Sequence, residues 1–99
     1  MRSVRLLAQA RCEIRDAAEY YEDRVEGLGI DFTHKVDEAI LDICENPERW
    51  LVLKNDIRRR LIPRFPYCLL YRVEREEVVV VAVMHFSRQP GYWVGRGRK

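Results

Sequence analysis

Hydrophobic residues recur with two different periods along the chain, and the change of period predicts the order of its elements. Val4 and Leu6 alternate with polar neighbours over residues 2–7, which predicts a short strand. From about Ala10 the apolar residues recur every three or four positions, as on one face of a helix: they are Ile14, Ala17, Ala18, Tyr21, Val25 and Leu28. The acidic residues among them are expected to face water: Glu13, Asp16, Glu19, Glu22, Asp23 and Glu26.

A second helix is predicted after a short turn. Glycine accepts the left-handed conformation with which many helices stop, so Gly27 and Gly29 are expected to end the first helix. Asp31 is the expected N-cap of the second helix, and Asn46 followed by Pro47 its end. Its apolar stripe comprises Phe32, Val36, Ala39, Ile40, Ile43 and Cys44. Helices joined by so short a turn are expected to form an antiparallel hairpin.

The second half of the chain predicts strands at residues 56–62, 67–73 and 78–84. The continuous apolar run at 78–84 indicates a strand covered on both faces, and therefore a central one. Residues 89–99 are expected to be irregular or only briefly helical. Together these elements predict a single α+β domain over residues 1–99 in the order β-α-α-β-β-β, with the helix hairpin packed on a small, largely antiparallel sheet.

The charge of the chain is unevenly distributed, although its formal net charge is only +2. Residues 1–50 carry a net charge of −5 and residues 51–99 a net charge of +7. Such a split indicates interaction with nucleic acid or with an acidic partner.

Several classes of protein and site are excluded by the same sequence. The longest apolar run has seven residues, far below the roughly 18 needed to cross a bilayer, so no membrane association is expected. Cys12, Cys44 and Cys68 are odd in number and widely spaced, which predicts reduced, mostly buried thiols in a cytoplasmic protein. Neither a glycine-rich phosphate loop nor a metal-ligand spacing is present, so no cofactor and no metal are expected.

Candidate binding residues gather in three places. Arg58, Arg59 and Arg60 are followed by Arg64, and strand alternation puts Arg58 and Arg60 on one face, where two guanidiniums could bind phosphates or carboxylates. The alternative is an edge strand whose charges discourage aggregation. His85 and Arg88 follow the valine-rich strand, where loops often carry functional groups, although a lone histidine is more often structural.

The third group lies in the tail. Tyr92 and Arg96 combine an aromatic ring with a cation, which suits stacking on bases and contact with phosphate. Trp93 is expected instead to fold back on the core, and the role of Tyr92 stays open between these two.

These residues, in this order, resemble the RelE/ParE-type toxins of bacterial type II toxin–antitoxin systems. The resemblance is carried by residues 17–21, 27–29, 46–47, 57–59, 65–67 and 82–85, together with Phe32, Trp50, Tyr71, Arg88, Pro90, Tyr92, Trp93 and Arg96. It implies a compact toxin that an antitoxin neutralises by wrapping helical and extended segments around it.

The family divides by mechanism. ParE-type members bind DNA gyrase and poison it without chemistry of their own, whereas RelE-type members cleave mRNA, often on the ribosome, without a metal. Nuclease members commonly carry an arginine directly after the position of Tyr67, where this chain has Cys68, and a lysine at the position of Leu61. The sequence therefore resembles the ParE branch more closely, and is interpreted as a non-enzymatic, gyrase-binding toxin.

Two alternatives stay open. One is a metal-independent endoribonuclease that acts on RNA with Arg59, His85 and Arg88 as its catalytic set, and the other is an inactive member that only binds a partner. In every case the residues expected to meet the antitoxin or the target are Arg58, Arg59, Arg60, Arg64, His85, Arg88, Tyr92 and Arg96. An acidic antitoxin segment is expected across Arg58, Arg60 and Arg88.

Overall fold

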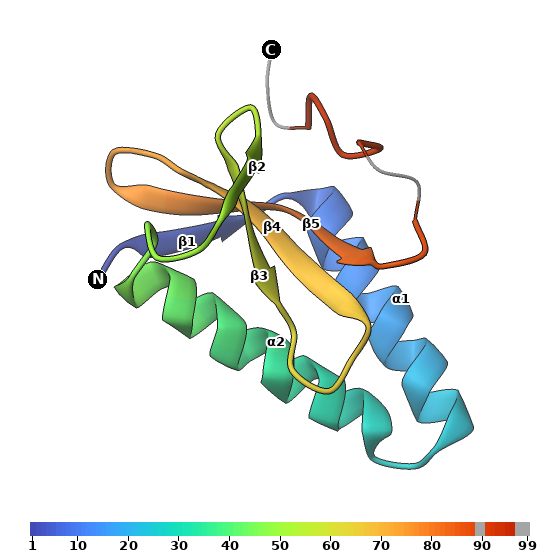
Figure 1. The fold of residues 1–99 in the computed structure, drawn as a ribbon. Helices are drawn as coiled ribbons and strands as arrows, with labels where there is room; N and C mark the ends of the chain where they lie inside the picture. The colour runs from blue at the N-terminus through green and yellow to red at the C-terminus, as the bar shows by residue number, and fades with distance from the viewer. Residues whose placement is uncertain (89–90, 97–99) are drawn as a thin grey trace.

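The computed structural model describes residues 1–88 and 91–96, so Gln89, Pro90 and residues 97–99 of the basic tail lie outside the described part. Seven elements follow one another in the order β-α-α-β-β-β-β (Figure 1). They are β1 (Ser3–Leu6), α1 (Ala8–Arg24), α2 (Leu28–Glu45), β2 (Val52–Lys54), β3 (Ile57–Leu61), β4 (Tyr67–Val73) and β5 (Glu77–His85).

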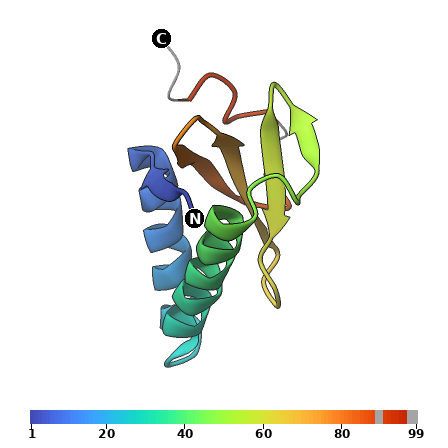
Figure 2. The same cartoon turned by 90° about the vertical axis from the view of Figure 1, so that its left-hand side faces the viewer.

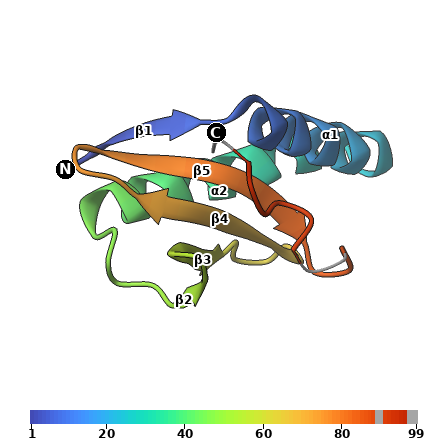
Figure 3. The same cartoon turned by 90° about the horizontal axis from the view of Figure 1, so that it is seen from above.

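The strands form a five-stranded sheet in the order β1-β5-β4-β3-β2, as the view from above shows (Figure 3). β1 pairs with β5 in parallel, and the other neighbours are antiparallel. The register between β4 and β5 shifts by an irregularity between Leu70 and Tyr71. The predicted α+β class and largely antiparallel sheet are confirmed.

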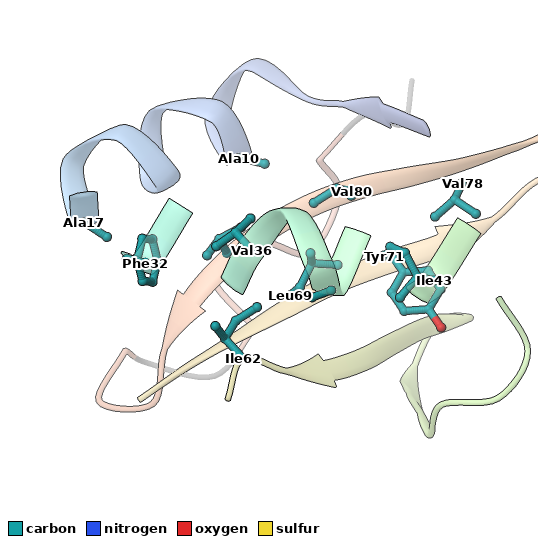
Figure 4. Close-up of a cluster of buried hydrophobic side chains, with 12 residues drawn as sticks. Ala10, Ala17, Phe32, Val36, Ile43, Ile62, Leu69, Tyr71, Val78 and Val80 are labelled. Atoms are coloured by element: carbon teal, nitrogen blue, oxygen red, sulfur yellow. The ribbon is translucent and has the colours of Figure 1, made fainter. Parts of the chain in front are cut away.

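Both helices cover one face of this sheet and form a separate layer beside it (Figure 2). Val36 and Ile43 of α2 lie in one cluster with Leu69 and Tyr71 of β4 (Figure 4). The ring centre of Phe32, also on α2, lies 5.0 Å from that of Tyr67. Tyr21 of α1 adds an aromatic contact to this core: its ring centre lies 5.0 Å from that of Phe65. Helix and sheet thus bury one continuous apolar cluster between them.

The valine-rich strand is central, as predicted. β5 lies between β1 and β4, and its residues from Val78 to Val83 are all 2% exposed or less. Its second face packs against Trp93, which is only 6% exposed, together with Leu70 of β4. Trp93 therefore caps the core, as expected, and residues 91–96 form turns rather than a regular element.

The turn between the helices differs from the prediction. α1 ends at Arg24, and α2 begins at Leu28 with Gly27 as its N-cap at a φ of 86°. Gly29 therefore belongs to α2, and Asp31 lies in its first turn, so the predicted cap at Asp31 was wrong. The carboxylate of Glu22 accepts hydrogen bonds from the backbone N–H groups of Gly27 and Gly29, and so caps α2 from the preceding helix.

The sequence prediction also missed a strand. β2 has three residues, all of them exposed, and its pairing with β3 is interrupted by a register shift between Val52 and Lys54. Asn55 and Asp56 both have a positive φ and form the tight turn between the two strands. A strand this short has too few residues to show an alternating pattern.

The three cysteines are free thiols, with Cys44 and Cys68 buried and Cys12 exposed. Within residues 1–88 and 91–96, neither helix is long and apolar enough to cross a membrane.

Candidate functional site

The arginine run on β3 is divided between the two faces of the sheet. Arg58 and Arg60 share a face, as predicted, but this is the face toward the helices. Arg58 Nη1 donates hydrogen bonds to the carbonyl oxygens of Glu48, at 3.1 Å, and Trp50, at 2.7 Å. Arg60 Nη2 lies 2.7 Å from Asp42 Oδ2 on α2. Both guanidiniums are therefore engaged in internal contacts: Arg58 holds the segment after α2 against the sheet, and Arg60 holds α2 itself.

The same segment is fixed by two further contacts. The ring of Trp50 lies near the guanidiniums of Arg49 and Arg60, whose carbon atoms are 5.2 and 5.3 Å from the ring centre. The buried hydroxyl of Tyr71 donates to the carbonyl oxygen of Pro47 at 2.6 Å. Burial raises the pKa of Tyr71 to about 12, against an opposing effect of the nearby arginines.

Arg59 lies on the other face of β3, close to the buried Cys68. Burial raises the pKa of the Cys68 thiol to about 11, and the positive charge of Arg59 acts in the opposite direction. Arg64 is separate again. It has a φ of 74° in the turn between β3 and β4, is exposed, and borders a cleft of about 460 Å³ toward α2.

The four remaining candidates meet where β5 ends, beside α1. His85 Nδ1 accepts a hydrogen bond from the backbone N–H of Ser87 at 2.9 Å, so the proton of the neutral ring is on Nε2. The His85 ring meets that of Tyr67 edge-on, at 4.9 Å between ring centres. The Arg88 guanidinium carbon lies 3.9 Å from the centre of the Tyr92 ring. His85, Arg88 and Tyr92 line a pocket of about 250 Å³.

Glu13 of α1 organises this group, and the sequence prediction missed it by assigning it to the water-facing side. Its carboxylate accepts hydrogen bonds from the Val83 backbone N–H and Arg96 Nη1, both at 3.0 Å, and from the Tyr92 hydroxyl at 2.7 Å. A signal was present in the spacing, because Glu13 lies three residues after Ala10 and four before Ala17, the two buried positions of α1.

The pair of Glu13 and Arg96 closes an open stretch of sheet edge. β1 ends at Leu6, opposite Val80, so that in the described part of the chain no strand pairs with the following residues of β5 on that side. Arg96 Nη1 donates to the carbonyl oxygen of Val81 at 3.1 Å, while Glu13 binds the N–H of Val83. Burial and the Glu13 carboxylate both raise the pKa of Tyr92, so its hydroxyl remains a donor.

Comparison with known proteins identifies the family. The family model described as "ParE toxin of type II toxin-antitoxin system, parDE" matches residues 4–90. The chain belongs to the ParE toxin family. A solved structure described as the chromosomal ParDE toxin–antitoxin system from P. aeruginosa has a similar fold: its matching chain is 14% identical, with a TM-score of 0.73, over 86% of this chain and 96% of that one. Among curated proteins, none matches significantly.

In this ParE-family chain, the residues of the alternative nuclease set are brought together only in part. His85 and its ring neighbour Tyr67 lie on the helix side of the sheet, whereas Arg59 lies on the opposite side, beside Cys68. Arg88 is the member of the set that shares the pocket of His85. Across the described residues, no group of His, Cys, Asp and Glu side chains could hold a metal ion.

Proposed function

We propose that this chain inhibits growth by binding and poisoning DNA gyrase, without catalysing a reaction itself. Membership of the ParE toxin family over residues 4–90 is the observation that carries the proposal. Gyrase is the target that the resemblance to ParE-type toxins implies. The basic and aromatic group at the end of β5 is the surface we assign to this contact, because Arg and Tyr are enriched among residues that dominate binding energy.

The side-chain geometry favours a binding protein over a ribonuclease. Metal-independent RNA cleavage needs a cation at the phosphate and a proton-transfer group within hydrogen-bond reach of the same reacting atoms. Arg59 and His85 project from opposite faces of the sheet, and Arg58 and Arg60 are bound to internal acceptors. Only Arg88 lies with His85 among the described basic side chains of that set.

Inducible expression without an antitoxin tests the proposal in cells. We expect a DNA damage response while transcripts stay intact, and a weaker response with Arg88→Ala. Arg75→Ala is the matched control, since Arg75 is exposed at the opposite end of β5, in the turn before it. Cleaved transcripts and early translation arrest would favour the ribonuclease instead, and normal growth would favour an inactive partner-binding member.

The partner that we propose is an acidic antitoxin. Arg59 is half-buried and Arg64 and Arg88 are exposed, so these can meet an acidic segment, whereas Arg58 and Arg60 are committed to internal contacts. The outer edge strand β2 supports strand addition, because Leu51, Val52 and Leu53 before and within it are 64%, 46% and 40% exposed. Apolar anchors on this edge would supply affinity, and the arginines would speed the encounter.

Charge reversal tests this contact. Arg88→Glu should slow association with the antitoxin by about an order of magnitude at low salt, with a smaller effect at high salt. Surface plasmon resonance at two ionic strengths measures both rates, and Arg75→Glu controls for net charge. Equal association rates for the two variants would place the antitoxin elsewhere.

A further inference from the structure

We propose that Glu13 is a positioning residue, whose carboxylate fastens residues 91–96 to the open edge of β5 and thereby fixes Tyr92 beneath Arg88. The inference rests on the proposed function for its consequence on gyrase, whereas the fastening itself can be measured on the isolated protein. It assigns a role to a side chain on α1 that lies far in sequence from the residues it holds.

Glu13 differs from the other acidic residues of α1 in its surroundings. Its side chain is 16% exposed and that of its partner Arg96 is 17% exposed. Asp16, three residues later, is 74% exposed and lies 4.0 Å from Arg15 in a pair open to water. Glu22 is used at the turn between the helices. Glu13 therefore makes a contact of a different kind from the solvated acidic residues on the same helix.

The polar contacts of the segment converge on this carboxylate. Removing it leaves the Val83 N–H, the Tyr92 hydroxyl and the Arg96 guanidinium each without the acceptor they share. A buried cation without its partner carries a desolvation penalty that its other contacts do not offset. Two further hydrogen bonds of Arg96 remain: its guanidinium donates to the carbonyl oxygen of Val81, and its own carbonyl oxygen accepts from Arg72 at 3.5 Å. Neither bond gives the Arg96 guanidinium a negatively charged partner. Release into water is then the favourable outcome for Arg96.

The position of Arg88 depends on the same contact through Tyr92. The Tyr92 ring contacts two guanidiniums, with Arg88 at 3.9 Å and Arg96 at 4.9 Å from its centre. Since Glu13 binds both the hydroxyl of this ring and the Arg96 guanidinium, it fixes the surface on which exposed Arg88 rests. A rigid cation beside an aromatic ring loses little freedom on binding, and fits a protein surface that presents carboxylates.

The test compares Glu13→Ala with Glu13→Gln and with Glu19→Ala, an exposed residue of the same helix. Hydrogen exchange at the Val83 amide reports the bond to Glu13, and the fluorine signal of 5-fluorotryptophan at Trp93 reports the segment. We expect exchange at Val83 to accelerate roughly tenfold or more in Glu13→Ala, with a solvent-exposed signal for Trp93. Glu13→Gln keeps an acceptor without the charge, so its exchange rate at Val83 and its Trp93 signal should lie between those of the wild type and Glu13→Ala. Glu19→Ala should match the wild type in both.

Gyrase inhibition supplies the functional readout, and Glu13→Ala should need about tenfold more protein for the same effect. Tyr92→Phe removes only the hydrogen bond from the Tyr92 hydroxyl to Glu13. If Glu13→Ala does not fold, Tyr92→Phe replaces it in the comparison with the wild type. Unchanged exchange at Val83 and an unchanged Trp93 signal would overturn the fastening. A released segment with full gyrase inhibition would overturn the positioning role. If the wild type leaves gyrase untouched, the proposed function fails, and the exchange data alone decide on the fastening.

Discussion

Two glycines at the turn between the helices meet different steric demands. Gly27 occupies the left-handed region at a φ of 86°, with open space where a side chain would be. Gly29 is in the ordinary helical region, but a Cβ there would collide with the carbonyl oxygen of Ala18 on α1. Gly29 thus permits the close approach of the two helices, and its N–H binds Glu22.

Gly29→Ala is therefore expected to destabilise the protein more than Gly27→Asn. Overpacking against backbone that cannot move away should cost about 2 to 3 kcal/mol. Asparagine tolerates the left-handed region, so Gly27→Asn should cost about 1 kcal/mol or less. Urea unfolding of the two variants measures the difference. Equal free energies of unfolding would show that the helices do not depend on this contact.

Side-chain chemistry could be predicted from the sequence better than its surroundings. The tail residues Tyr92 and Arg96 were selected as a cation beside an aromatic ring, and the structure places them together. The role of Glu13 was missed because it was grouped with five other acidic residues of α1 and its turn, although its spacing from Ala10 and Ala17 puts it on the buried side of the helix. Spacing alone could not show what Glu13 binds, because its partners come together where β1 ends opposite Val80, which is a tertiary feature.

At the scale of elements, the edge strand β2 depends on side chains of its neighbours. Arg58 binds two carbonyl oxygens of the segment before β2, and the hydroxyl of Tyr71 binds a third, at Pro47. These contacts fix residues 47–50, directly before Leu51, Val52 and Leu53, which are exposed and add little apolar burial of their own. The edge is thereby held in place for the partner that we propose.

Arg58→Met should loosen this edge, and Arg59→Met is its matched control on the other face of β3. Methionine keeps most of the aliphatic stem but cannot donate to the carbonyls of Glu48 and Trp50. We expect a loss of about 1.5 to 3 kcal/mol for Arg58→Met, and at most about 0.5 kcal/mol for Arg59→Met. Chemical denaturation gives both values. A larger loss at Arg59 would contradict the division of the arginine run between the two faces.

The arginine run at residues 58–60 shows which features of an element can be predicted from the sequence and which cannot. Alternation correctly put Arg58 and Arg60 on one face, because the period of a strand is local. Which face meets the helices depends on the packing of Ile62 and Tyr71 against α2, and this decides whether the guanidiniums meet protein or water. The strand at 67–73 was predicted with its observed bounds, whereas β2 was missed because it has three residues.

At the scale of the whole molecule, burial shifts several groups toward high pKa. It raises the pKa of Tyr71 from 10.0 to about 12 and that of Cys68 from 9.0 to about 11. Tyr21, Tyr67 and Tyr92 shift in the same direction. Above pH 9 the unfolded chain therefore loses protons that the folded protein still holds, and stability must fall as pH rises.

We expect the urea midpoint to decrease steadily from about pH 9 to pH 12, in a window set by the pKa values of Cys68 and Tyr71. The urea midpoint of Tyr71→Phe should decrease less steeply above pH 10, since that variant lacks one of the groups whose pKa is raised by burial. Denaturation series at constant ionic strength test both. A midpoint that is flat to pH 11 would show that these side chains reach water in the folded state.

The structure divides the positive charges of residues 51–99 into those bound inside the protein and those exposed to water. The cations of residues 51–99 include Arg58, Arg60 and Arg96, which are engaged in internal contacts. Lys54, Arg64, Arg75 and Arg88 are exposed. A protein that binds a macromolecule through a small, preorganised group needs no metal or nucleophile. The family membership and the separation of Arg59 from His85 both agree with such a mode of action.

Trapping of DNA cleavage complexes by purified gyrase is the most direct measurement of the central claim. With the purified chain, ATP and supercoiled plasmid, we expect linear DNA to accumulate after detergent and protease treatment, and less of it with Arg88→Ala than with Arg75→Ala. Absence of linear DNA and unimpaired supercoiling at a large molar excess of the folded protein would contradict the account.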